Sequence, residues 1–124
     1  MAFTGKYVLE SQENYEAFLK ALGIKDAKDH NNEEIITDIY QNDNFRLTKF
    51  LMDKTWNNTF LIGKESELET LDGETFKTTV TLDGGKLMIQ FPKYVYTAEV
   101  VGDKLVEVNT IDAVTNKMVS KKTK

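Results

Sequence analysis

Apolar and polar residues alternate over most of the chain from residue 35 onward. Short runs rich in β-branched and aromatic side chains recur there, separated by turn sequences such as LDGG (82–85) and VGD (101–103). Alternation with a period of two is typical of strands that bury one face, and such frequent turns indicate a barrel or a sandwich. We predict strands near residues 6–10, 35–40, 45–52, 55–62, 66–71, 75–82, 86–91, 94–101, 104–110 and 114–121.

Consecutive strands joined by short turns form an antiparallel up-and-down sheet. Closure into a barrel removes the exposed edges of such a sheet. A barrel of about ten strands encloses more space than side chains alone fill, so a ligand cavity is expected. The prediction is therefore an all-β, ten-stranded antiparallel up-and-down β-barrel, with residues 1–124 as a single domain.

Helical periodicity occurs near the N-terminus. A helix over residues 13–22 would present one apolar face, made of Tyr15, Phe18, Leu19 and Leu22. Ser11 or Asn14 is suited to cap its start, and Gly23 to end it.

Residues 25–34, KDAKDHNNEE, carry almost no apolar side chain. A short polar helix has little to dock with, so we expect a loop with at most one helical turn. Asp26, Asp29 and His30 lie in this segment, but a metal site needs about three or four donors in fixed geometry, and no metal is expected.

Alternation also assigns the side chains that face the barrel interior. On the strand near 104–110 it selects Val106 and Val108, and at the end of 55–62 it selects Ile62. The inward set as a whole is aromatic and aliphatic with a few polar points, which is typical of a site for an apolar ligand. Together with the helix, it gives these candidate ligand-binding residues: Tyr15, Phe18, Leu47, Lys49, Leu51, Trp56, Asn58, Phe60, Phe76, Thr78, Leu87, Ile89, Tyr94, Tyr96, Met118 and Ser120.

Lys49 is the most informative candidate, because the parity of FRLTKFL (45–51) turns it toward the lumen. There it would pair with a ligand carboxylate or sulfonate, or react with a carbonyl as a neutral amine. The alternatives are a bulge that shifts the parity, or a side chain that extends to water at the mouth. If Lys49 faces inward without a partner, Lys49→Met should stabilise the ligand-free protein.

Composition excludes several classes of function. The chain has no Cys and a net charge of −4, which disfavours thiolate chemistry and nucleic-acid binding. No Ser-His-Asp arrangement or phosphate-binding loop is evident, so we expect neither an enzyme nor a cofactor. Residues 11–34 hold six acidic against three basic side chains, which allows at most transient membrane contact. Without a signal peptide or membrane span, a cytoplasmic monomer is expected.

Several motifs resemble the intracellular lipid-binding proteins, the fatty-acid-binding family. GKYVLESQENYEAFLKAL (5–22) is similar to the N-terminal signature of that family. GKES (63–66), GGKL (84–87), FPKY (91–94), VGDKLVEV (101–108) and VSKK (119–122) are most similar to its ileal bile-acid-binding branch. The resemblance implies a single lipid-binding barrel of ten strands with a lipid inside, and two short helices that form a lid over the barrel and border its portal. The second of these would fall on residues 25–34, where the composition favours a loop.

The resemblance also implies which ligand head group the cavity suits. Fatty-acid binders of this family hold a carboxylate with two arginines and a tyrosine, and these positions fall on Ala98, Met118 and Ser120. Leu47, Lys49, Tyr96 and Met118 depart from the bile-acid branch and Tyr94 matches it, which indicates a divergent or redesigned member. A carrier of a bile acid or steroid-like acid is therefore the first hypothesis, with a fatty-acid or retinoid binder and a Schiff-base scaffold that uses Lys49 as alternatives.

Overall fold

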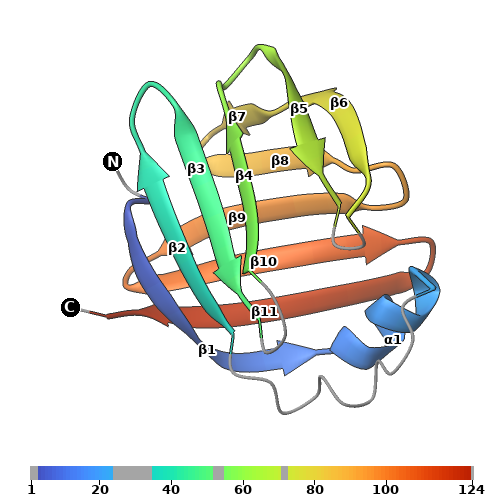
Figure 1. The fold of residues 1–124 in the computed structure, drawn as a ribbon. Helices are drawn as coiled ribbons and strands as arrows, with labels where there is room; N and C mark the ends of the chain where they lie inside the picture. Colours follow the sequence, from blue (N-terminus) through green and yellow to red (C-terminus); the bar gives the residue numbers. More distant parts are fainter. Residues whose placement is uncertain (1–2, 24–34, 52–54, 71–72, 124) are drawn as a thin grey trace.

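The computed structural model describes residues 3–23, 35–51, 55–70 and 73–123. One short helix and eleven strands are assigned in these ranges (Figure 1). Their bounds are β1 Gly5–Glu13, α1 Tyr15–Ala21, β2 Ile36–Gln41, β3 Phe45–Phe50, β4 Thr55–Phe60, β5 Glu65–Glu69, β6 Thr75–Thr79, β7 Thr81–Asp83, β8 Lys86–Gln90, β9 Val95–Val101, β10 Lys104–Ile111 and β11 Val114–Lys122. The segment 25–34, on which the predicted loop falls, lies outside the described residues.

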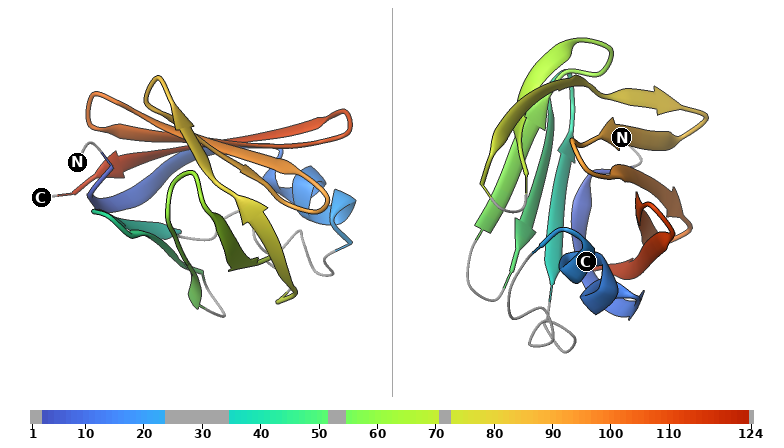
Figure 2. Two further views of the ribbon diagram at one scale, coloured as in Figure 1. Left: turned by 90° about the horizontal axis from the view of Figure 1, so that it is seen from above. Right: turned by 90° about the vertical axis from the view of Figure 1, so that its right-hand side faces the viewer.

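Antiparallel pairing joins nine of the strands in the order β4-β3-β2-β1-β11-β10-β9-β8-β7, and β5 pairs with β6 in a separate hairpin. The sheet curls on itself, so that β9–β11 face β2–β4 across the interior (Figure 2). The predicted antiparallel barrel is confirmed. The described strands show no backbone ladder between β4 and β5, so hydrogen bonding along the wall is interrupted at that point.

The strand predicted at 75–82 is two strands. β6 pairs with β5, whereas β7 pairs with β8, and the break falls at Val80. Val80 is fully buried, and its carbonyl oxygen accepts the N–H of Gly63 at 2.9 Å instead of joining either ladder. The chain bends there because its two halves pair with different neighbours.

Other boundaries also differ from the prediction: the helix predicted over 13–22 spans Tyr15–Ala21, and several strand ends are shifted. β1 continues to Glu13, because a bulge between Leu9 and Ser11 lets it keep pairing with β11. β4 ends at Phe60, and Ile62, which alternation turned inward, is exposed. Alternation therefore does not identify the inward side chains beyond the last residue that pairs with a neighbouring strand.

The helix α1 is placed at one end of the sheet by contacts to β11. Asn14 takes the N-cap position but makes no side-chain cap, and its Nδ2 donates instead to Thr115 O at 3.0 Å. Asn116 Nδ2 donates to Glu13 O at 2.8 Å. Phe18 packs from α1 against Tyr94, with 5.0 Å between the ring centroids. The helix therefore covers the mouth of the curled sheet, as the predicted lid does.

Candidate ligand-binding site

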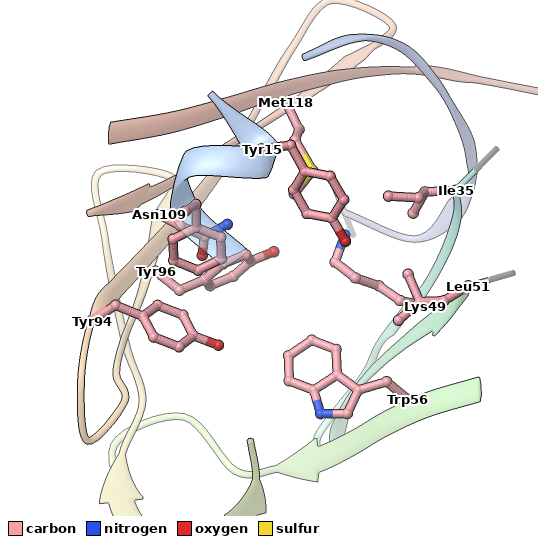
Figure 3. Close-up of a pocket in the computed structure, with 10 residues that line it drawn as sticks. Tyr15, Ile35, Lys49, Leu51, Trp56, Tyr94, Tyr96, Asn109 and Met118 are labelled. Carbon is pink, nitrogen blue, oxygen red and sulfur yellow. The ribbon is translucent and has the colours of Figure 1, made fainter. Parts of the chain in front are cut away.

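A pocket opens between α1 and the inner face of the sheet (Figure 3). Its cavity volume is about 20 Å³, which is room for about one water molecule. The predicted residues that line it are Tyr15, Phe18, Lys49, Leu51, Trp56, Tyr94, Tyr96 and Met118. Ile35 and Asn109 complete the lining and were not among the candidates.

The remaining candidates lie in other parts of the wall. Leu47, Asn58, Phe60, Leu87, Ile89 and Ser120 are buried, and Phe76 and Thr78 are half-buried, but none of them lines this pocket. Phe60 stacks on Phe45 at 5.2 Å, and Phe45 meets the ring of Phe3 at 5.5 Å. This aromatic cluster lies at the end of β3 away from Lys49 and serves as core packing in the described structure.

Lys49 faces the interior, as alternation predicts. Its exposed fraction is 4%, and it lies on β3 between the buried Leu47 and the half-buried Leu51. In Figure 3 the side chain reaches into the pocket from the side opposite Tyr96 and Asn109. Neither a bulge nor an extension to water displaces it.

The inner face of β10 is the reverse of the one predicted. Leu105, Glu107 and Asn109 are buried, whereas Val106 and Val108 are only half-buried. The aliphatic residues of this strand suggested the wrong face, because the inward face carries Glu107 and Asn109. The turn at Gly102 and Asp103 could have indicated the correct face. If Val101 pairs with Lys104 across this turn, Glu107 lies opposite Ala98, which alternation correctly placed inside.

Glu107 is the partner that Lys49 lacked in the sequence-based prediction. Lys49 Nζ lies 2.8 Å from Glu107 Oε1 and 2.7 Å from Oε2, and it donates to Thr37 Oγ1 at 2.9 Å. Glu107 is 1% exposed, and Thr37 is fully buried. The expectation that Lys49 is an unpaired amine in an apolar lining is therefore wrong.

Tyr96 completes this polar group by donating its hydroxyl hydrogen to Glu107 Oε2. Burial raises the pKa of Tyr96 well above its usual value, and the negative charge of Glu107, the hydrogen bond to it and nearby Tyr94 act in the same direction. The phenol therefore stays neutral and remains a hydrogen-bond donor. Lys49, Thr37, Glu107 and Tyr96, here called the buried quartet, join β2, β3, β9 and β10 across the lumen.

The buried quartet bears on the reactive-lysine hypothesis. An ammonium group bound to a carboxylate has no lone pair with which to attack a carbonyl. Lys49 Nζ contacts both carboxylate oxygens of Glu107, so this arrangement does not support a Schiff base at Lys49. No group of three or more His, Cys, Asp or Glu side chains suited to a metal ion occurs within the described ranges.

The three positions that carry the carboxylate-binding residues in fatty-acid binders face the interior here. Ala98, Met118 and Ser120 are 1%, 4% and 1% exposed. Because none of them is a cation or a phenol, this part of the wall offers no charged group to a carboxylate. Alternation therefore placed these three side chains on the correct face of their strands.

Side chains bridge the interruption between β4 and β5. Asn58 Nδ2 donates to Glu69 O at 3.1 Å, and Glu69 N donates to Asn58 Oδ1 at 2.8 Å. Trp56 Nε1 donates to Glu69 O at 2.9 Å and to Thr70 O at 3.2 Å. Trp56 and Asn58 with Glu69 and Thr70, here called the β4–β5 clasp, thus replace a backbone ladder. The polar atoms of Asn58 are engaged in this clasp, although alternation predicted a ligand contact for this residue.

A curled antiparallel sheet with an aromatic interior and a short helix over its mouth defines the class of small lipid-binding β-barrel proteins. The model of the lipocalin / cytosolic fatty-acid binding protein family matches residues 1–124, and the chain belongs to that family. Within the described residues, no helix is long and apolar enough to cross a membrane.

Individual relatives indicate the branch. The chain is 47% identical to gastrotropin from Rattus norvegicus and 46% identical to gastrotropin from Sus scrofa, each over 98% of both chains. It is also similar to zebrafish ileal bile-acid-binding protein complexed with cholic acid, with a TM-score of 0.87 and 41% identity over 99% of this chain and 100% of that one. The predicted resemblance to the ileal bile-acid-binding branch is confirmed.

Proposed function

We propose that the protein is a carrier that binds an amphipathic lipid in the barrel cavity, with a bile acid or a steroid-like acid as the preferred ligand. It acts without catalysis or a cofactor, as a cytoplasmic monomer whose single domain spans residues 1–124. The family and the aromatic pocket beneath α1 support the role of carrier. The gastrotropins and the zebrafish protein, whose structure contains cholic acid, support the class of ligand.

The observation that favours a bile acid over a fatty acid is the absence of an available cation in the described wall. A fatty acid bound with its carboxylate inward needs a partner for that charge, since a buried unpaired carboxylate is strongly unfavourable. Ala98, Met118 and Ser120 provide none, and Lys49 is bound to Glu107. A bile acid has hydroxyl groups on its rings and a carboxylate on its side chain, so its rings can enter while the charge stays near the mouth.

A competition experiment tests the proposal. An environment-sensitive apolar dye should bind the purified protein, and cholate should displace it at lower concentration than oleate does. Native mass spectrometry with the same two lipids should show the complexes directly. If neither lipid nor dye binds, the role of carrier is wrong.

A fatty-acid carrier is the second candidate, because the chain is also 41% identical to liver-type fatty acid-binding protein from Epinephelus coioides over 98% of its length. Oleate that displaces the dye at lower concentration than every bile acid tested would favour this candidate.

A further inference from the structure

We propose that Glu107 determines ligand specificity: it occupies the ammonium group of Lys49, keeps carboxylates out of the inner end of the cavity, and leaves that end to an uncharged, hydroxyl-bearing group. The inference deepens the proposed function and rests on it, because it assumes that a lipid enters this cavity. Four observations on the buried quartet and its surroundings carry it.

The first observation concerns the hydrogen-bond donors of Lys49. A lysine ammonium has three N–H groups and no acceptor. Lys49 Nζ lies within 2.9 Å of three acceptors, which are Thr37 Oγ1 and the two carboxylate oxygens of Glu107. The protein therefore supplies a hydroxyl group and both oxygens of one carboxylate to this ammonium group. A ligand carboxylate would have to compete with Glu107 for this cation.

The second observation concerns charge. Lys49 and Glu107 are the only charged side chains among the buried polar residues of the described ranges. Their charges cancel, so the described interior is electrically neutral. A carboxylate placed there would add an unbalanced negative charge beside Glu107, which is costly in a medium of low dielectric constant.

The third observation is the type of polar atom that remains for a ligand. The Tyr96 hydroxyl group donates its hydrogen to Glu107 and keeps its oxygen as an acceptor. Asn109 lines the pocket, uses one N–H to donate to Asn116 Oδ1 at 3.0 Å, and has a carbonyl oxygen. These oxygens can accept the hydrogen of an alcohol, and the second N–H of Asn109 can donate to the alcohol's oxygen. A hydroxyl group therefore matches both kinds of atom, whereas a carboxylate is itself only an acceptor.

The fourth observation is positional. Glu107 lies opposite Ala98 on β9 and opposite Met118 on β11, and neither of these side chains carries a charge. Neither neighbour draws Glu107 away from Lys49. The carboxylate that fills this part of the wall thus belongs to the protein and not to the ligand.

Oleic acid and oleyl alcohol test the inference, because they share one chain and differ in the end group. Wild-type protein should bind the alcohol at least as tightly as the acid. Glu107→Gln keeps the shape and one acceptor of the side chain, removes the charge, and frees Lys49 for a ligand. In this variant the affinity for oleic acid relative to oleyl alcohol should rise by about tenfold or more, the effect of one charge-assisted hydrogen bond.

Two variants act as controls. Glu67→Gln makes the same chemical change on the exposed face of β5 and should leave the ratio of the two affinities unchanged. Lys49→Met combined with Glu107→Gln removes both charges and should lose the gain in acid binding. A gain that persists in this double variant would overturn the role assigned to Lys49.

A second measurement needs no variant. With oleic acid labelled at the carboxyl carbon, NMR of the wild-type complex should show a carboxyl group that titrates near its value in water, as expected at the mouth. A carboxyl signal that resists titration, or tighter binding of the acid than of the alcohol by wild type, overturns the inference. If neither these two lipids nor cholate binds, the proposed function itself fails, and the two failures are thus distinguishable.

Discussion

The contact between Lys49 and Glu107 shows how a single residue depends on its partner. The side chains are 58 positions apart in sequence and almost fully buried. Breaking a buried ion pair from one side leaves the other charge without a partner, whereas replacing both members by apolar groups is often neutral or stabilising. Glu107 therefore stabilises Lys49 in the lumen. Removal of the Lys49 side chain should lower the stability of the protein even in the absence of any ligand.

Lys49→Met should lower the free energy of unfolding by about 3–5 kcal/mol, because it leaves Glu107 buried and unpaired. Lys49→Met combined with Glu107→Leu should recover most of this loss. Urea denaturation monitored by Trp56 fluorescence measures both variants. Lys77→Met, an exposed change on β6, is the control and should have little effect.

The opposite change in the free energy of unfolding would contradict this role of the pair. If Lys49→Met were as stable as the wild type or more stable, the pair would contribute nothing to the folded state. Such a result would agree instead with the alternative in which Lys49 is an unpaired inward amine.

At the scale of elements, the wall depends on side chains where backbone pairing stops. Asn58 donates to and accepts from the backbone of Glu69, as a neighbouring strand would. The hairpin of β5 and β6 is thus tied to β4 through the β4–β5 clasp. The stability of this hairpin should depend on an amide side chain more than on the apolar residues around it.

Asn58→Leu should destabilise the protein by about 1–3 kcal/mol, since it leaves the N–H and carbonyl of Glu69 without these partners. Amide exchange at Glu69 should become faster, while exchange in β10 and β11 should change little. Asn57→Leu is the matched control, because Asn57 is exposed and its Oδ1 accepts the hydroxyl hydrogen of Thr48. Equal effects of the two substitutions would show that the clasp has no special role.

At the scale of the whole molecule, the wall of the cavity is mostly apolar, and the buried charges of the described residues cancel. The buried described side chains carry one positive and one negative charge. Any substitution that changes this balance should change the class of ligand, even where it leaves the shape of the barrel intact. Met118 is the most direct place to test this, because it lies opposite Glu107 and lines the pocket.

Met118→Arg should raise the affinity for oleate by about tenfold or more, because the inserted guanidinium gives the interior one excess positive charge. Fluorescence displacement of the bound dye measures the change. Met88→Arg adds the same charge on the exposed face of β8 and should have no such effect. Unchanged oleate binding in Met118→Arg would show that the balance of charge in the cavity does not control ligand class.

Much of the fold and part of the site could be predicted from the sequence. Alternation is a local property with a period of two residues, so it places Lys49, Trp56, Tyr96 and Met118 inside without knowledge of their neighbours. The apolar face of α1 follows from helical spacing in the same way. These predictions succeed because burial of one face is the strongest constraint on each element.

The tertiary structure alone decided which polar groups meet. The partner of Lys49 comes from β10, where two valines outweighed Glu107 and Asn109 in the choice of the inner face. The break at Val80 and the role of Asn58 depend on which strand each backbone group pairs with. Residue pattern defines the two faces of a strand, but only the register between strands determines which buried charge finds a partner.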